Sequence, residues 1–176
     1  MNDALERIRA AQLYALRAHG AQMHGDRPYI CHLTDVATIL VEDCYGVEPE
    51  LAQAAFLHDV IEDTDATPGE IEDLFGERVA DLVWAVTGVG ETRKERNESV
   101  YAKIHGVKDA AMLKVCDRLA NIRSCLANQS LKHMRLYAEE AEAFKDRVVE
   151  PALPLPARLM TNFYEAHRTL CENLRS

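Results

Sequence analysis

Helical spacing of apolar residues is the feature that most constrains the fold of this chain. Apolar side chains recur every three or four positions, as on one face of an α-helix, within residues 33–41, 79–86, 131–148 and 160–174. No sustained alternation of apolar and polar residues, the pattern of a half-buried strand, competes with them. The sequence therefore predicts an all-α fold, a bundle of about eight to ten helices.

Turn-forming residues fall where such helices would begin and end. Residues 67–70, TPGE, have the spacing of an N-cap threonine, a first-turn proline and a capping-box glutamate. Gly76 and Gly88 are placed to end helices. Three prolines within residues 151–156 interrupt two helical patterns and predict a stiff turn into the last helix, with a polyproline ligand as the alternative.

A chain of 176 residues is sized for one globular domain, and we assign residues 1–176 to a single domain. Such a domain buries about 70% of the surface that its unfolded chain exposes, so any metal site must be explained by function rather than by folding. The net charge of −9 argues against nucleic acid or an anionic membrane as a partner, because both require a basic face. A small polyanionic substrate requires only a local group of positive side chains.

Five cysteines without a CxxC pair fit neither a disulfide framework nor a cysteine-ligated zinc site, and they indicate a reducing compartment. The N-terminus carries Asp3 and Glu6 where a signal peptide requires positive charge. No stretch approaches the roughly 18 apolar residues of a membrane span. We therefore expect a cytoplasmic protein with no membrane partner, and the sequence leaves its oligomeric state open.

Four polar side chains interrupt the otherwise apolar segment AAFLHDVIEDT, residues 54–64. If the segment is helical, Glu62 lies one turn beyond His58 and Asp63 lies one turn beyond Asp59. A metal held by His58 and Asp59 would then have two carboxylates beside it. For this segment taken alone the alternative stays open, namely a buried packing histidine followed by an acidic helix end.

A second polar group stands in the apolar stretch at residues 110–126, where Asp117 is surrounded by core residue types. A buried ionised carboxylate costs several kcal/mol unless it is paired or binds a cation. The alternative to a metal is a salt bridge to an arginine such as Arg118. Asn121 and Ser124 follow on the same helical face, which suggests a path from metal to substrate.

His32 begins a strong amphipathic stripe just after Pro28, so it is a third candidate ligand, with packing or helix capping as its alternative. The other histidines have no ligand-like spacing and are interpreted as surface or packing residues. Residues 88–99 are polar and include Arg93, Lys94 and Arg96. This segment is either a solvated loop or helix edge, or a mobile basic segment beside a site.

Three motifs in order, PYICH (28–32), LHDVIEDT (57–64) and LKVCDRLANIRS (113–124), resemble those of the HD-domain metal phosphohydrolases. More narrowly, they are similar to the (p)ppGpp hydrolase domain of the SpoT/RelA proteins and to the stand-alone small alarmone hydrolases. The resemblance covers roughly residues 5–126, and only the helical pattern supports residues 127–176. It implies a single HD-type helical domain.

The resemblance also implies a site. One divalent metal ion, with Mn²⁺ favoured by the mixed nitrogen and oxygen donors, would be bound by His32, His58, Asp59 and Asp117. Glu62 and Asp63 match the acidic pair that positions and activates the attacking water in this family. Asn121 matches a residue near the ribose or phosphate, and Ser124 a small hydroxyl residue near the base. The candidate cations for a charged substrate are Lys94, Arg96, Lys103 and Arg118.

The implied reaction is hydrolysis of the 3′-pyrophosphate of (p)ppGpp, which gives GDP or GTP and pyrophosphate. No synthetase-like region follows, so we expect degradation only. One alternative is an HD phosphohydrolase that acts on another phosphorylated nucleotide, such as an adenine alarmone or a nucleotide 2′- or 3′-phosphate. An alternative from another class is a non-catalytic nucleotide-binding module with the same helical fold.

The segment before the PY pair departs from the family pattern. Family members usually carry an arginine there that packs on the nucleobase, whereas AQMHGDRPY has His24 at the matching place and is about one residue shorter. An imidazole has a smaller face and need not be charged, so base preference is expected to differ. Arg27 is near enough in the sequence to substitute for the missing arginine.

Overall fold

The computed structural model describes residues 2–175 and confirms the all-α class. Nine helices of eight residues or more lie in this described part: α1 (Asn2–His19), α2 (Tyr29–Asp43), α3 (Pro49–Leu57), α5 (Pro68–Phe75), α6 (Glu77–Val86), α7 (Arg93–Lys103), α8 (Ala110–Ala127), α9 (Leu131–Glu139) and α11 (Ala157–Asn173). Two helices are four residues long, α4 (Val60–Asp63) and α10 (Ala141–Phe144). Short 3₁₀ turns cover Ile104–Gly106 and Glu150–Ala152, and a π-helical turn covers Lys145–Val149.

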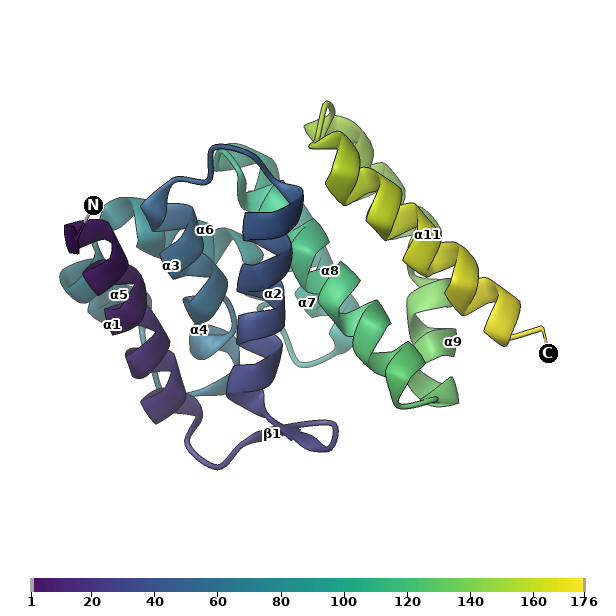
Figure 1. The fold of residues 1–176 in the computed structure, drawn as a ribbon, viewed down its shortest axis with the longest axis horizontal. Coiled ribbons are helices and arrows are strands. Elements are labelled where there is room, and N and C mark those ends of the chain that lie inside the picture. The colour runs from purple at the N-terminus through teal and green to yellow at the C-terminus, as the bar shows by residue number, and fades with distance from the viewer. Residues whose placement is uncertain (1, 176) are drawn as a thin grey trace.

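The one sheet in the described residues is a small antiparallel hairpin before α2. Its strands β1 (Met23–His24) and β2 (Arg27–Pro28) pair Met23 with Pro28 and His24 with Arg27. A left-handed Gly25 with φ of +66° closes the turn between the strands. The hairpin projects at the end of α2 (Figure 1), so it brings His24 close to the first turn of that helix.

Helices α2 and α8 pack against each other at the centre of the molecule (Figure 1). Helices α3 and α1 continue the layer on one side of α2, and α11 packs against α8 on the other side. The buried apolar side chains form one connected core, which includes Leu33, Leu57, Leu82, Leu113 and Leu170, all with no exposed surface. The one-domain assignment stays a prediction, and this continuous core supports it.

The predicted helix boundaries are largely observed. Thr67 accepts a hydrogen bond from the Glu70 N–H, Pro68 is the first residue of α5, and Gly76 follows the last residue with φ of +88°. Helix α6 ends at Val86, two residues before Gly88. Residues 151–156 form the predicted turn, with Pro156 immediately before α11. No helix among the described residues has the length and apolar character needed to cross a membrane.

Candidate active site

The four expected metal ligands come together from three distant parts of the chain. His32 lies in the first turn of α2, His58 and Asp59 lie between α3 and α4, and Asp117 lies in the middle of α8. The His32 Nε2 atom is 3.6 Å from Asp59 Oδ2 and 3.3 Å from Asp117 Oδ1. The His58 Nε2 atom is 3.1 Å and 3.7 Å from the same two oxygens. Donor atoms of His32, His58 and Asp59 all lie within 4.8 Å of one another.

A break in the helix at His58 and Asp59 aims these two side chains. The spacing argument for residues 54–64 assumed one continuous helix, but α3 ends at Leu57 and α4 begins at Val60. Asp59 has φ of −105° and ψ of −3°, the sparsely populated bridge region found at many active sites. The His58 Nδ1 donates to the Ala55 carbonyl at 2.9 Å, which directs its Nε2 toward the cluster.

The cluster has the chemistry of a cation site. The His58 Nε2 is buried and has no hydrogen-bond partner. Burial opposes protonation, but the negative charges of Asp59 and Asp117 raise the pKa of His58 to about 10. Burial likewise opposes ionisation of Asp117, yet Lys114 and the two imidazoles hold its pKa well below the usual range. Two imidazoles and two carboxylates that require compensating positive charge fit one divalent metal ion.

Three further side chains hold the two carboxylates in place. The Tyr29 hydroxyl donates to Asp59 Oδ2 at 2.7 Å. The Lys114 Nζ lies 2.9 Å from Asp117 Oδ2, and the Asn121 amide donates to Asp117 Oδ1 at 2.5 Å. Sequence reasoning assigned no role to Tyr29 or Lys114. A signal existed for Lys114, because it precedes Asp117 by three residues and therefore shares its helical face.

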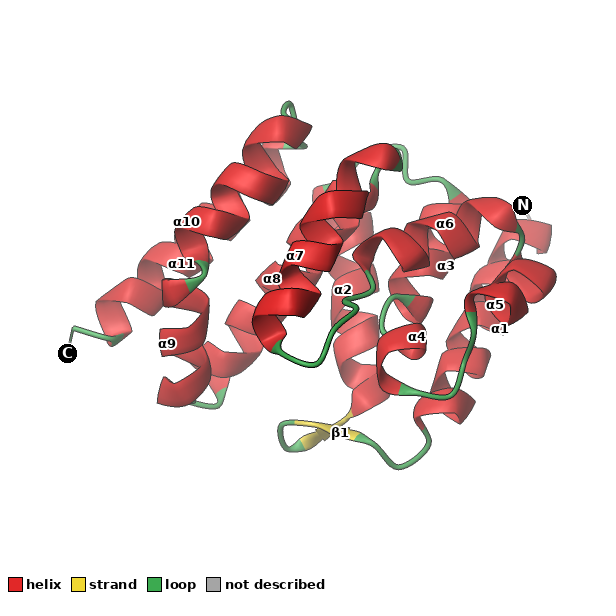
Figure 2. Cartoon of the chain, turned by 180° about the vertical axis from the view of Figure 1, so that it is seen from behind, coloured by secondary structure: helices red, strands yellow, loops and turns green. Residues whose placement is uncertain are grey.

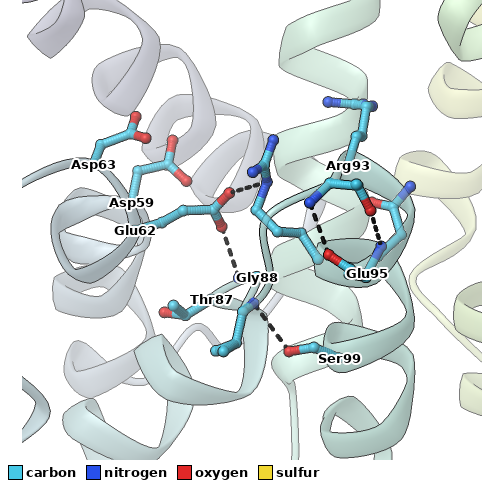
Figure 3. Close-up of polar contacts among 12 residues, drawn as sticks. Asp59, Glu62, Asp63, Thr87, Gly88, Arg93, Glu95 and Ser99 are labelled. Atoms are coloured by element: carbon cyan, nitrogen blue, oxygen red, sulfur yellow. Dashed lines mark hydrogen bonds and ion pairs between the residues drawn. The ribbon is translucent and has the colours of Figure 1, made fainter.

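Glu62 and Asp63 stand beside the cluster on α4. Figure 3 shows Glu62 reaching from this helix toward Gly88, whose N–H donates to Glu62 Oε2 at 2.6 Å. The Arg96 Nε lies 3.4 Å from the other carboxylate oxygen. Burial raises the pKa of Glu62 above its ordinary value. Asp63 accepts a 3.2 Å hydrogen bond from Gln22.

Gly88 lies in the loop between α6 and α7, which passes beside α4 (Figure 2) and is held by several hydrogen bonds. The Val89 N–H donates to Ser99 Oγ at 3.0 Å, and Thr92 and Glu95 form a complete capping box at the start of α7 (Figure 3). Residues 88–99 therefore form a hydrogen-bonded loop and the start of α7, and Arg96 of this segment lies beside the cluster. A Cβ atom at Gly88 would lie 2.9 Å from Glu62 Oε2, so this close approach requires glycine.

The cluster opens into a hollow of about 240 Å³, which we call the metal pocket. A larger hollow of about 680 Å³, which we call the chamber, adjoins it, and the two share His24, Asn121 and Tyr137. His24 Nε2 donates to Asn121 Oδ1 at 3.0 Å, and its ring stacks on His32 at 4.4 Å between centroids. Burial, together with the neighbouring His32, lowers the pKa of His24.

This geometry agrees with the comparison to known protein families, in which residues 7–145 match the HD domain family. The chain belongs to that family. Its sequence is 37% identical over 145 residues to a guanosine-3′,5′-bis(diphosphate) 3′-pyrophosphohydrolase of Aquifex aeolicus (strain VF5), an alignment that covers 79% of this chain and 20% of the relative. It is 38% identical over 116 residues to guanosine-3′,5′-bis(diphosphate) 3′-pyrophosphohydrolase MESH1 of Danio rerio, covering 62% of this chain and 64% of the relative.

Solved structures agree with the fold. A metazoan ortholog of SpoT that hydrolyzes ppGpp and plays a role in starvation responses matches with a TM-score of 0.78 and 27% identity, over 93% of this chain and 94% of that one. A protein from Listeria monocytogenes EGD-e matches with a TM-score of 0.65 and 26% identity, over 82% and 99% of the two chains. The chain spans about a fifth of the length of the first curated relatives.

Some of the remaining predicted substrate-binding residues line the two hollows, and others lie outside them. Ser124 lines the chamber, whereas Arg27 lies outside it and pairs with Asp35 at 2.9 Å. Arg96 and Arg118 line the metal pocket. Lys94 is exposed on α7 and lines neither hollow.

Lys103 lines neither hollow and instead contacts the end of α6. Its Nζ donates to the Thr87 carbonyl at 2.8 Å and lies 4.0 Å from the centroid of the Trp84 ring. Burial lowers the pKa of Lys103. This contact ties α7 to the end of α6, next to the loop that carries Gly88.

Proposed function

We propose that this chain hydrolyses the 3′-pyrophosphate of (p)ppGpp, releasing pyrophosphate and GDP or GTP, with one divalent metal ion, Mn²⁺, as cofactor. The observation that carries the proposal is the buried cluster of His32, His58, Asp59 and Asp117, with Glu62 and Asp63 beside it and a nucleoside-sized chamber adjoining. The relatives named for this activity support the choice of substrate. We place the reaction in the cytoplasm because all five cysteines are free.

The side chains of the metal pocket have distinct proposed roles in the hydrolysis. His32, His58, Asp59 and Asp117 would hold the divalent metal, which would supply Lewis acidity to the phosphoryl group and the attacking water. Glu62 and Asp63 are the candidate proton acceptors for that water. The raised pKa of Glu62 brings this group closer to neutral pH, where a general base is most effective. Tyr29, Lys114 and Asn121 keep the ligand carboxylates oriented.

The chamber is the proposed nucleoside site. Its lining carries neutral amide, hydroxyl and imidazole groups, among them His24, Asn121, Ser124 and Asn128. Within the described residues, no lysine or arginine lines it. This observation favours a second candidate substrate, the corresponding adenine nucleotide, because a charged arginine is absent from the place where the family carries one.

The test is a nucleotide panel assayed with Mn²⁺ and identified products. We expect pyrophosphate release from ppGpp, from pppGpp and from the adenine analogue, together with one metal ion per chain by elemental analysis. Release of orthophosphate from simple nucleotide 2′- or 3′-phosphates alone would replace the proposal with a different HD phosphohydrolase. Nucleotide binding without any turnover in the metal-loaded protein would identify a binding module.

A further inference from the structure

The cationic side chains of the metal pocket are unequally neutralised. Four of them line it in the described part of the chain: Arg93, Arg96, Lys114 and Arg118. Arg96 pairs with Glu62, and Lys114 pairs with Asp117. Arg93 and Arg118 instead share a single carboxylate, Glu140. The group formed by Arg93, Arg118 and Glu140 therefore carries one excess positive charge.

Glu140 gathers donors from two helices. It directly follows α9, and its Oε1 accepts from the Arg93 Nε at 2.5 Å and from the Asn97 amide at 3.0 Å. Its Oε2 accepts from Arg93 Nη2 at 3.0 Å and pairs with Arg118 Nη1 at 2.9 Å. The carboxylate thus fixes α7 and α8 relative to the end of α9, and four donor atoms saturate its lone pairs.

The two arginines differ in freedom. The Arg118 side chain is 8% exposed, and its guanidinium lies 4.9 Å from the Tyr137 ring centroid and 4.5 Å from that of Phe144. It is enclosed, so Glu140 serves as its counterion. The Arg93 side chain is 44% exposed, and Glu140 engages only its Nε and Nη2 atoms. Its Nη1 group makes no contact with Glu140, and Arg93 lines the metal pocket.

We propose that Glu140 is a positioning residue, which holds Arg93 at the edge of the metal pocket as the binding group for the pyrophosphoryl part of the substrate. The inference rests on the proposed function for the identity of that substrate. A planar guanidinium held along one edge presents its other donors in a fixed geometry, which suits phosphate oxygens. Two guanidinium groups share the one Glu140 carboxylate, which leaves the unbalanced positive charge that a polyanion needs.

Glu140→Asp tests the geometry without changing the charge. The shorter side chain cannot reach Arg93, Asn97 and Arg118 at once, so Arg93 loses its fixed edge. We expect KM for ppGpp to rise about fivefold while kcat changes less than about twofold. The affinity for inorganic pyrophosphate, measured by calorimetry with Mn²⁺ present, should fall by a similar factor. Glu139→Asp, at the exposed neighbouring position, is the matched control and should leave both values unchanged.

A double-mutant cycle separates positioning from a general structural role. Arg93→Gln keeps the Glu140–Arg118 pair, so it should fold normally, and it should weaken pyrophosphate binding about tenfold. If Glu140 acts through Arg93, Glu140→Asp has no further effect on pyrophosphate affinity in the Arg93→Gln background. Additive losses in the cycle would overturn the positioning role, and unchanged pyrophosphate affinity in Arg93→Gln would overturn the binding site itself.

Pyrophosphate binding requires no turnover, so the two proposals fail separately. A protein that binds pyrophosphate through Arg93 but hydrolyses no nucleotide would refute the proposed function and retain this inference. Normal hydrolysis of ppGpp with KM and pyrophosphate affinity insensitive to Arg93→Gln would refute this inference and retain the proposed function.

Discussion

The metal pocket and the adjoining chamber share lining residues from β1, α8 and α9, but they differ in the charge of their linings. The metal pocket is lined largely by ionisable side chains, and each of its four cations pairs with a carboxylate. The chamber is larger, about 680 Å³ against 240 Å³, and most of its polar lining groups are neutral. Buried charges are stable only in fixed mutual geometry, whereas neutral amides and hydroxyls exchange partners at little cost. The contrast suggests that chemistry is rigidly determined in one hollow and recognition is adjustable in the other.

The largest effect is expected in the metal pocket, from removal of a candidate metal ligand. Asp117→Ala leaves His32, His58 and Lys114 facing one another without their shared carboxylate. We expect metal affinity to fall about 10³-fold and turnover to be abolished, because loss of one partner from a buried charge cluster costs about 3–5 kcal/mol. Metal titration with Asp81→Asn, an exposed acid on α6, provides the control. Full metal stoichiometry and affinity in Asp117→Ala would show that the ligand assignment is wrong.

The acidic pair tests whether binding and chemistry separate within the metal pocket. Glu62→Gln and Asp63→Asn preserve shape and lie outside the ligand cluster, so metal content and fold should be largely retained. We expect kcat to fall about 10²-fold or more in each, since both are candidate proton acceptors. Elemental analysis on the assayed samples verifies the loading. A near-normal kcat in both loaded variants would remove the pair from the mechanism.

Gly88→Ala tests how closely the loop must approach the acidic pair. The new Cβ would lie 2.9 Å from Glu62 Oε2 and 2.7 Å from Arg96 Cβ, so the carboxylate must shift. We expect kcat to fall about tenfold with metal affinity unchanged, because small displacements of a reacting group are costly. Gly69→Ala is the control, since a Cβ there meets nothing within 4 Å. Equal rates for the two variants would show that the loop does not position Glu62.

The smallest effect is expected in the chamber, at His24. Its imidazole can bond Asn121 and stack, but it lacks the permanent charge and five donors of arginine. We expect kcat/KM for guanine and adenine 3′-pyrophosphorylated nucleotides to lie within about tenfold, or about 1.4 kcal/mol, and His24→Arg to widen the gap. A thousandfold wild-type preference that survives His24→Ala would instead place base recognition around Asn121 and Ser124, since Arg27 lies outside the chamber.

Local patterns were sufficient for much of the fold, and together with the motif resemblance they indicated the candidate ligand set. Helical spacing and cap residues predicted the all-α class and the start and end of α5, because both depend on neighbours within one or two turns. His32, His58, Asp59 and Asp117 stand in apolar segments, where a buried polar or charged side chain needs a partner or a bound cation. Their roles as metal ligands stay a prediction, supported by the geometry that brings them together.

Only the tertiary structure decided which cations face the site. Arg93 and Lys94 are adjacent in the sequence, yet Arg93 lines the metal pocket and Lys94 does not, because successive residues of a helix point about 100° apart. The pairing of Arg93 and Arg118 with Glu140 depends on how α7, α8 and the end of α9 cross. A sequence determines periodicity and residue type over a few turns, whereas the choice among equivalent ion pairs is made by packing between helices that are distant along the chain.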